Sequence, residues 1–196
     1  MLFKIKSFYY NLNNMKNTKQ EIRNIIKNRR SKLLPKEVIK KSEAIINKVK
    51  TKILDGNFEI ISVYYSTENE VQTQELIKWL FSIGKRVVIP FMDSDHNMEM
   101  KEIDSFDFKR EVFLGIIQPI QEYKSIDIKK IDLTITPCLG FDKKHNRLGY
   151  GLGCYDKMLR ETNSMSWLLA FDVQEFGEIP TEECDEEIDI IFTETR

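Results

Sequence analysis

Residues 136–156 read TPCLGFDKKHNRLGYGLGCYD, and this segment is the most informative part of the sequence. It follows residues 131–136, IDLTIT, whose apolar and β-branched residues predict a buried strand. Four of the eight glycines lie between positions 140 and 153, with Arg147 among them. Cys154 and the residues after it read as the start of a helix. A strand, a glycine-rich loop with a fixed positive charge and a helix N-terminus together predict a phosphate-binding loop.

The spacing of these glycines differs from the familiar nucleotide-binding patterns. They alternate as GxGxG, which is neither the GxGxxG pattern nor the GxxxxGK[ST] pattern. Spacing alone therefore leaves two interpretations open. One is a phosphate-binding loop, and the other is a structural loop that only turns the chain.

Length and composition predict one soluble domain. The 196 residues include 41% hydrophobic and 31% charged residues, an ordinary balance for a soluble protein. We expect a single domain over residues 16–196, preceded by an extension over residues 1–15. A net charge of −1 argues against attraction to nucleic acid or a membrane surface, and no apolar run has the length of a membrane span. We expect a monomer that acts on small molecules.

The cysteines and the first residues bear on the location of the protein. Cys138, Cys154 and Cys184 are odd in number and widely spaced, which favours a reducing compartment over a disulfide framework. Residues 1–14, MLFKIKSFYYNLNN, lack the arginine-rich pattern and the clear cleavage site of a targeting segment. We expect a cytoplasmic protein. The alternatives for residues 1–14 are an organellar targeting segment and an extension upstream of a natural start at Met15.

The middle of the chain predicts parallel strands joined by a helix. Residues 58–65, FEIISVYY, predict a strand, a helix follows Thr73, and residues 86–91, RVVIPF, predict the next strand. This β-loop-α-β order implies parallel strands with a right-handed crossover. We therefore predict an α/β fold of three layers, α/β/α, with a mostly parallel central sheet. Other strands are predicted at residues 98–103, 167–171 and 190–193, and other helices from Thr18 to about Leu33 and from Pro35 to Gly56.

The first predicted helix has an apolar stripe and a basic flank. Thr18 and Glu21 make a capping box, and the stripe consists of Ile22, Ile25 and Ile26. The basic flank consists of Lys19, Arg23, Lys27 and Arg30. Taken alone, these four residues are best explained as a solvated face.

Within the central segment, FDKKHNRLGYGLGCYD resembles the signature of the 5-formyltetrahydrofolate cyclo-ligases, also called methenyltetrahydrofolate synthetases. The family pattern is FD, a short turn, RLG, an alternating glycine run and then YYD. The matching residues are Arg147, Gly149, Gly151, Gly153, Tyr155 and Asp156. The sequence departs from the pattern at His145, where a turn glycine is usual, and at Leu152, where glycine or lysine is usual. It also departs at Cys154, where the first tyrosine is usual.

This resemblance extends from about Lys19 to Glu194, and it implies a reaction. The reaction is the conversion of 5-formyltetrahydrofolate to 5,10-methenyltetrahydrofolate by an ATP-dependent C–N ligase, with ATP as co-substrate and Mg²⁺ as cofactor. The implied ATP-binding residues are Lys19, Gln20, Glu21, Ile22, Arg23, Arg147, Leu148, Gly149, Tyr150, Gly151, Leu152, Gly153, Cys154 and Tyr155. The implied substrate-binding residues are Tyr65, Glu70, Tyr150, Gly151, Leu152, Gly153 and Cys154. The implied Mg²⁺ ligands are Asp156 and Asp189.

Weaker features complete the prediction. Residues 115–119, GIIQP, resemble a linker of the same family. Met98 and Met100 are candidates for an apolar wall of the site, with simple core positions as the alternative. His96 has no partner nearby in the sequence and is expected at the surface.

Two other classes of function stay open at this point. One is a non-catalytic paralogue on this fold that binds nucleotide or RNA through the basic first helix. The other is an ATP-independent enzyme that acts on sugar phosphates. The presence of Glu70, Arg147, Asp156 and Asp189, together with the net charge of −1, counts against the first alternative.

Overall fold

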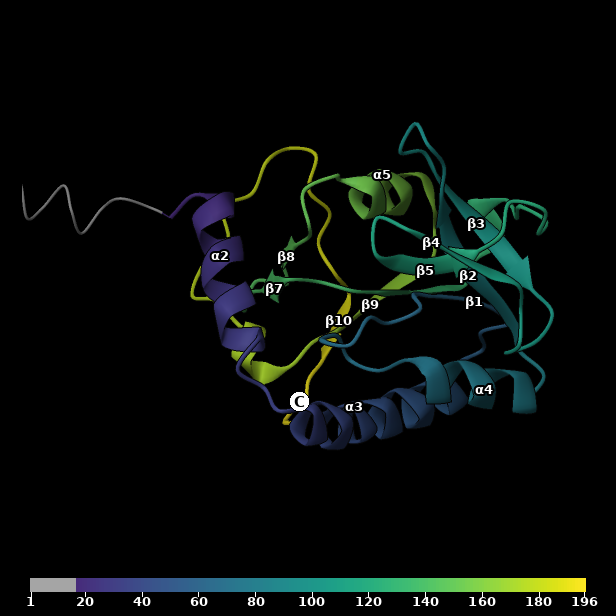
Figure 1. The fold of residues 1–196 in the computed structure, drawn as a ribbon, viewed down its shortest axis with the longest axis horizontal. Coiled ribbons are helices and arrows are strands. Elements are labelled where there is room, and N and C mark those ends of the chain that lie inside the picture. Colours follow the sequence, from purple (N-terminus) through teal and green to yellow (C-terminus); the bar gives the residue numbers. More distant parts are fainter. Residues whose placement is uncertain (1–16) are drawn as a thin grey trace, which may run out of the picture.

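The computed structural model of the protein describes residues 17–196, so the extension predicted over residues 1–15 lies outside the described residues (Figure 1). One six-stranded sheet runs through the molecule in the order β10-β9-β6-β1-β2-β3. In that order the strands are Ile190–Phe192, Met165–Leu169, Leu133–Thr136, Ile60–Val63, Arg86–Met92 and Met98–Ile103. All neighbouring strands are parallel except β2 and β3, which confirms the predicted mostly parallel sheet.

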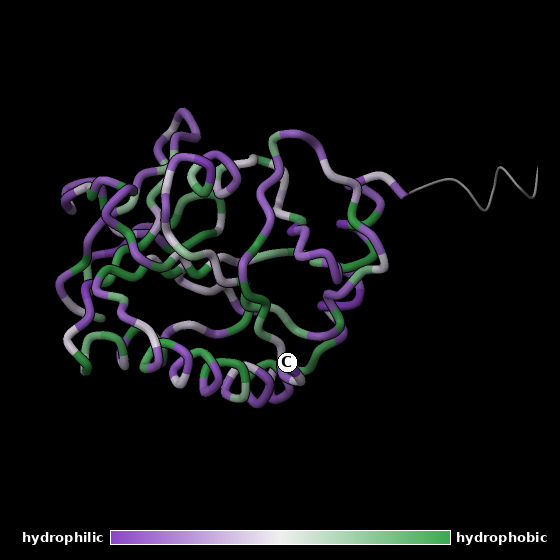
Figure 2. Tube along the Cα trace, turned by 180° about the vertical axis from the view of Figure 1, so that it is seen from behind, coloured by the Kyte–Doolittle hydropathy of each residue, from purple (hydrophilic) through white to green (hydrophobic). Residues whose placement is uncertain are grey.

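Helices cover both faces of this sheet (Figure 1). The helices α3 (Pro35–Asp55) and α4 (Gln74–Ser82) lie along one face, and α5 (Cys154–Glu161) lies on the other. Figure 2 shows how apolar and polar residues alternate along α3, as expected for a helix with one buried face. All four residues of β1 are buried because this central strand is covered on both sides. Among residues 17–196, no helix is both long and apolar enough to cross a membrane.

The first described helix, α2 (Lys19–Arg30), begins as predicted and ends early. Thr18 and Glu21 form the expected capping box. The helix stops before Leu33 because Leu34 precedes a proline and adopts an extended conformation. Ile22 and Ile26 are fully buried, but Ile25 is 36% exposed, so the apolar stripe is narrower than predicted.

β1 ends at Val63, two residues before the predicted end, because Thr73 binds the backbone that follows. The Thr73 hydroxyl donates to the Tyr64 carbonyl oxygen at 2.6 Å and accepts from the Ser66 amide at 3.1 Å. Thr73 is the residue before α4, but its side chain makes no capping bond to that helix. It instead fixes the loop that carries Glu70 at the carboxyl end of β1.

Residues 115–119, predicted as a linker, belong to a β-hairpin. Its strands β4 (Arg110–Phe113) and β5 (Ile116–Pro119) are antiparallel and turn at Leu114 and Gly115, which both have positive φ. The Gln118 side chain bonds both the amide and the carbonyl of Met92, which attaches the hairpin to β2. The remaining short elements are η1 (Ile128–Lys130), β7 (Gly140–Phe141), β8 (Arg147–Leu148) and η2 (Asp172–Gln174).

Candidate active site

A cleft of about 1000 Å³ opens beyond the ends of β1 and β6, bordered by α2, the β4–β5 hairpin and residues 147–153, hereafter the glycine loop. This is where ligands bind in open α/β sheets. Most of the predicted site residues line it, namely Lys19, Gln20, Arg23, Tyr65, Glu70, Arg147, Leu148, Gly149, Tyr150, Gly151, Leu152, Gly153, Cys154, Tyr155 and Asp156. Glu21 and Ile22 do not line it, because Glu21 closes the capping box and Ile22 packs against Leu148.

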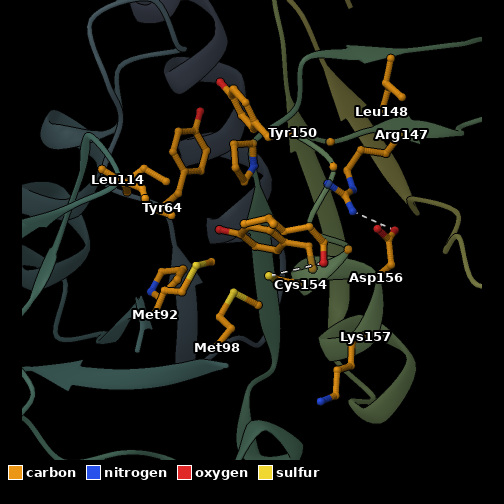
Figure 3. Close-up of a pocket in the computed structure, with 18 of the residues that line it drawn as sticks. Tyr64, Met92, Met98, Leu114, Arg147, Leu148, Tyr150, Cys154, Asp156 and Lys157 are labelled. Atoms are coloured by element: carbon orange, nitrogen blue, oxygen red, sulfur yellow. Dashed lines mark hydrogen bonds and ion pairs between the residues drawn. The ribbon is translucent and has the colours of Figure 1, made fainter. Parts of the chain in front are cut away.

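Arg147 supplies a fixed charge at the back of the cleft. Its side chain is almost fully buried, and Nη2 lies 2.8 Å from Asp156 Oδ1 (Figure 3). The guanidinium also lies 5.6 Å from the centre of the Tyr155 ring. Its Nε is buried and has no hydrogen-bond partner among the described residues. A buried donor without a partner costs stability unless a ligand satisfies it, so this atom indicates a site for an acceptor.

The glycine loop favours glycine at Gly149 because an arginine side chain lies against its backbone, and at Gly151 because of its backbone conformation. A Cβ on Gly149 would lie 2.9 Å from Arg147 Nη1. Gly151 has a φ of +118°, and a Cβ there would lie 3.6 Å from Arg23 Nη2. Arg23 Nε donates to the Gly149 carbonyl oxygen at 2.9 Å, which joins α2 to the loop. Two arginines therefore lie against the backbone of the predicted phosphate-binding loop, Arg147 from the loop itself and Arg23 from α2.

The basic flank of α2 turns toward the cleft and is not a solvated face. Lys19, Arg23 and Arg30 line the cleft, and only Lys27 of the four points into solvent. Lys19 Nζ lies 2.6 Å from Asp185 Oδ2 and 3.3 Å from Glu182 Oε1. Partial burial opposes the charge, but the two carboxylates raise the pKa of Lys19, so the amine stays protonated.

Glu70 lies opposite the glycine loop and is bonded to it. The Tyr150 hydroxyl donates to Glu70 Oε1 at 2.7 Å, while Glu70 Oε2 accepts from the Thr67 amide at 2.9 Å. The predicted substrate residue and the predicted nucleotide loop therefore meet directly.

The half of the cleft opposite Arg147 is apolar, and few of its residues could be recognised in the sequence. The hairpin and β2 supply most of this wall, through residues including Phe91, Met92, Phe113, Leu114 and Ile116. Figure 3 shows Met92, Met98 and Leu114 on the side of the cleft away from Arg147 and Asp156. Met98 lines the cleft as predicted, but Met100 is a core residue of β3. The part of this apolar wall that the β4–β5 hairpin supplies, called the hairpin wall below, was indicated in the sequence only by the linker-like residues 115–119.

Tyr65 lines the cleft and is held by an arginine. The Arg110 guanidinium donates to the Tyr65 hydroxyl at 2.7 Å and also lies over the Phe106 and Phe108 rings. This fixes Tyr65 beside the Glu70 loop.

The predicted pair of Mg²⁺ ligands requires a correction. Asp156 lines the cleft, but Asp189 does not, because its carboxylate accepts from the Ser166 amide and hydroxyl at the amino end of β9. The cleft lies at the opposite, carboxyl end of these strands. The aspartate of the acidic tail that does line the cleft is Asp185. Asp185 and Asp156 are neighbours, since the amide of Glu186 donates to Asp156 Oδ1 at 3.3 Å.

None of the cysteines is placed as a nucleophile. Burial raises the pKa of Cys138 to about 12 and also raises the pKa of Cys154 above its ordinary value. Cys184 lies on the exposed tail. Burial likewise raises the pKa of Tyr155, which keeps that hydroxyl neutral. His96 is exposed, as predicted.

His145 explains one departure from the family pattern. Its φ is +66°, a conformation that favours glycine, and its Nδ1 lies 2.7 Å from the Ile188 carbonyl oxygen. The side chain therefore joins the turn to the tail and offsets the cost of the backbone conformation.

We predict that His145→Gly leaves activity within a few-fold and the melting temperature nearly unchanged. The relieved backbone strain, about 1–2 kcal/mol, offsets the lost hydrogen bond, about 1 kcal/mol. His145→Val should lower the melting temperature clearly, because valine keeps the strain without the bond. Turnover and thermal denaturation of both variants test this. A folded His145→Gly variant without activity would make the imidazole a functional group.

The fold and this cleft together define an α/β protein with a cleft, basic on one side and apolar on the other, beyond the carboxyl ends of its parallel strands. Residues 15–194 match the sequence model of the 5-formyltetrahydrofolate cyclo-ligase family. The chain therefore belongs to the 5-formyltetrahydrofolate cyclo-ligase family.

Similar proteins agree with this assignment. A 5-formyltetrahydrofolate cyclo-ligase of Mus musculus is 31% identical over 193 residues, covering 90% of this chain and 93% of the mouse protein. One of Haemophilus influenzae is 27% identical over 174 residues, covering 85% of this chain and 92% of the bacterial protein. The solved structure of a 5,10-methenyltetrahydrofolate synthetase from Aquifex aeolicus has a TM-score of 0.79 at 23% identity, and covers 91% of this chain and 90% of that one. The likeness to that structure confirms the fold.

Proposed function

We propose that this protein converts 5-formyltetrahydrofolate to 5,10-methenyltetrahydrofolate in an ATP- and Mg²⁺-dependent reaction that releases ADP and phosphate. The observation that carries the proposal is the 2.7 Å bond between Tyr150 of the glycine loop and Glu70. It brings the loop suited to phosphates and the carboxylate suited to a reduced pterin into one cleft.

The two halves of the cleft match the two substrates. Lys19, Arg23 and Arg147 make one half cationic, which suits a triphosphate. The other half is lined by apolar side chains such as Met92 and Phe113, which suits a flat ring system. Because the basic flank faces the cleft, it supports a small-molecule site better than an RNA-binding surface.

The chemistry explains why ATP is needed. The formyl group on N5 is an amide, so resonance makes its carbon a poor electrophile and its oxygen a poor leaving group. Transfer of the γ-phosphoryl group to the formyl oxygen activates that carbon and releases ADP. N10 then attacks the carbon and loses its proton, and the C–O bond breaks as phosphate leaves. The formyl oxygen departs with the phosphate.

The residues of this chain orient the reactants and stabilise charge. Phosphoryl transfer depends on positioning and positive charge more than on covalent help from the protein. Arg147 is rigidly held by Asp156 and has a free donor, so it is suited to the charge that develops on the transferred group. The Glu70 carboxylate is suited to accept hydrogen bonds from the N–H groups of the pterin and so to fix its orientation.

The donor set fits a magnesium ion shared with substrate phosphates. No group of three or more His, Cys, Asp or Glu residues within residues 17–196 is placed to hold a metal ion. Mg²⁺ is often held by one or two carboxylates together with phosphate oxygens, and Asp156 and Asp185 offer two. When bound, Mg²⁺ would neutralise charge on the phosphates during transfer.

One assay tests the proposal. Purified protein with 5-formyltetrahydrofolate and Mg-ATP should produce the absorbing methenyl compound with one ADP per ring closed. ATP should not be consumed without the folate. Oxygen-18 placed in the formyl group should appear in the released phosphate. Product formed without label in the phosphate would exclude the phosphorylated formyl group, and the absence of product would exclude the proposed function.

Lys19→Ala and Arg23→Ala should each raise the KM for ATP with folding intact. Loss of a phosphate contact is worth about 1.5–3 kcal/mol. Neither side chain is part of the core, so unfolding free energies should change only by the worth of the lost Arg23–Gly149 or Lys19–Asp185 contact, about 1 kcal/mol. Lys27→Ala, on the solvent side of the same helix, is the matched control. ATP kinetics equal to those of the control in both variants would contradict the assignment.

Asp156→Asn and Asp185→Asn should each raise the Mg²⁺ concentration needed for half-maximal rate, whereas Asp189→Asn should not. A lost carboxylate contact to a cation is worth about 1.5–3 kcal/mol, or tenfold and more in concentration. Excess Mg²⁺ should partly restore the Asp156→Asn rate, because the amide keeps one oxygen. A Mg²⁺ dependence shifted by Asp156→Asn and Asp189→Asn, but not by Asp185→Asn, would favour Asp156 and Asp189 as the ligands instead.

We also propose that the enzyme is a cytoplasmic monomer whose single domain spans residues 16–196 and that acts on small molecules only. Cys138, Cys154 and Cys184 are all free, as suits a reducing compartment. Light scattering should give a mass of 23.2 kDa, and twice that value would exclude the monomer.

A further inference from the structure

Arg30 is a buried cation of the cleft, separate from the three cations proposed for the phosphates. It lies in the last turn of α2, is 8% exposed and lines the cleft. No carboxylate of residues 17–196 forms an ion pair with it. Its Nη2 donates to the Tyr150 hydroxyl at 3.0 Å, and its Nη1 makes a longer contact of 3.4 Å with the Cys138 carbonyl oxygen. A buried arginine stays charged, so its charge acts mainly on Tyr150.

Tyr150 connects Arg30 to Glu70 through its hydroxyl group. Burial, and then the nearby Glu70 carboxylate, raise the pKa of Tyr150, so its hydroxyl keeps the proton. A phenol has one proton to donate, and Tyr150 donates it to Glu70 Oε1 while accepting from Arg30. The three side chains form one directed chain of hydrogen bonds.

The position of one Glu70 oxygen depends on this chain. Oε2 is fixed by the Thr67 amide of its own loop, but Oε1 has the Tyr150 hydroxyl as its only side-chain partner among the described residues. Tyr150 is half exposed and belongs to the glycine loop, where the backbone alone restrains its ring weakly. The hydrogen bond from Arg30 and the approach of its guanidinium, 5.9 Å from the ring centre, restrain it further.

We propose that Arg30 is a positioning residue for the folate substrate, which it serves by holding the Tyr150 hydroxyl against Glu70. This inference rests on the proposed function. It predicts that Arg30 affects folate binding through Tyr150, and not as a direct ligand of the ATP phosphates.

A double-mutant cycle tests this. The affinity for 5-formyltetrahydrofolate is measured by calorimetry, without ATP, for wild type, Arg30→Met, Tyr150→Phe and the double variant. We expect each single variant to weaken binding by about tenfold, and the double variant to bind as Tyr150→Phe does, within about twofold. Arg30→Lys should recover part of the loss, because it keeps the charge. The affinity for a non-hydrolysable ATP analogue should change by less than about threefold in Arg30→Met.

Controls separate positioning from loss of structure. Arg29→Met is the matched control, since its guanidinium bonds the Glu175 carbonyl oxygen outside the cleft, and it should leave folate affinity unchanged. If Arg30→Met fails to fold, Arg30→Lys takes its place in the cycle.

Three results would overturn the inference. One is additive losses from Arg30→Met and Tyr150→Phe, and another is a loss of ATP affinity in place of folate affinity. The third is a wild-type protein that does not bind 5-formyltetrahydrofolate, which would overturn the proposed function as well. If wild type binds and converts the folate but the losses add, only the role of Arg30 is wrong.

Discussion

Arg147→Met is expected to lower kcat by about 10²–10³-fold, the largest effect of any single substitution in the cleft. Arg147 is 7% exposed and its guanidinium is held by Asp156, so it needs no reorganisation when charge develops on the transferred phosphoryl group. Arg147→Lys should recover little, because an ammonium group cannot bond Asp156 and a phosphate oxygen in the same planar arrangement. Single-turnover rates with saturating ATP and folate measure the effect.

Stability must be separated from catalysis in this variant. Removing one partner of a buried ion pair costs about 3–5 kcal/mol, because Asp156 is left without its cation. Arg147→Met/Asp156→Asn should recover much of that stability without recovering turnover. Arg86→Met is the matched control, because Arg86 also pairs with a carboxylate, Glu102, but outside the cleft. A folded Arg147→Met variant that turns over within tenfold of wild type would contradict the role proposed for this arginine.

Glu70→Ala is expected to weaken the use of the folate by about 10²-fold or more, with a much smaller change in the KM for ATP. Loss of one member of a buried, charged hydrogen-bonded pair typically costs about 2–5 kcal/mol. The Tyr150 hydroxyl and the Thr67 amide would also lose their acceptor. The measurement is kcat/KM for 5-formyltetrahydrofolate at saturating ATP, and then KM for ATP at saturating folate.

Two further variants sharpen this test. Glu70→Gln keeps an acceptor oxygen for Tyr150 but loses the charge, so its activity should fall between wild type and Glu70→Ala. Glu75→Gln is the matched control, because Glu75 is an exposed glutamate of α4 that pairs with Lys78. Equal losses in kcat/KM for both substrates would mean that Glu70 supports the fold of the cleft and not the folate in particular.

The local elements of this protein could be predicted from the sequence, because local interactions determine them. Three segments define their own backbone conformation. They are the capping box at Thr18 and Glu21, the β-branched run before Pro137 and the glycines around Arg147. The order of strand, loop, helix and strand then implied a parallel sheet with the site at its carboxyl edge.

Contacts between distant residues decided the rest. Arg30 and Lys27 belong to the same basic flank, and only the packing of Ile22 and Ile26 against Leu148 and Ile179 determines that Arg30 faces the cleft. Asp185 and Asp189 lie in one acidic tail, and β10 pairing with β9 places Asp189 beside Ser166 while Asp185 reaches Lys19. The hairpin wall is located by bonds from Gln118 to Met92. The periodicity of apolar residues in the sequence indicates which residues share a face of one helix or strand. Which other element that face packs against depends on the tertiary structure.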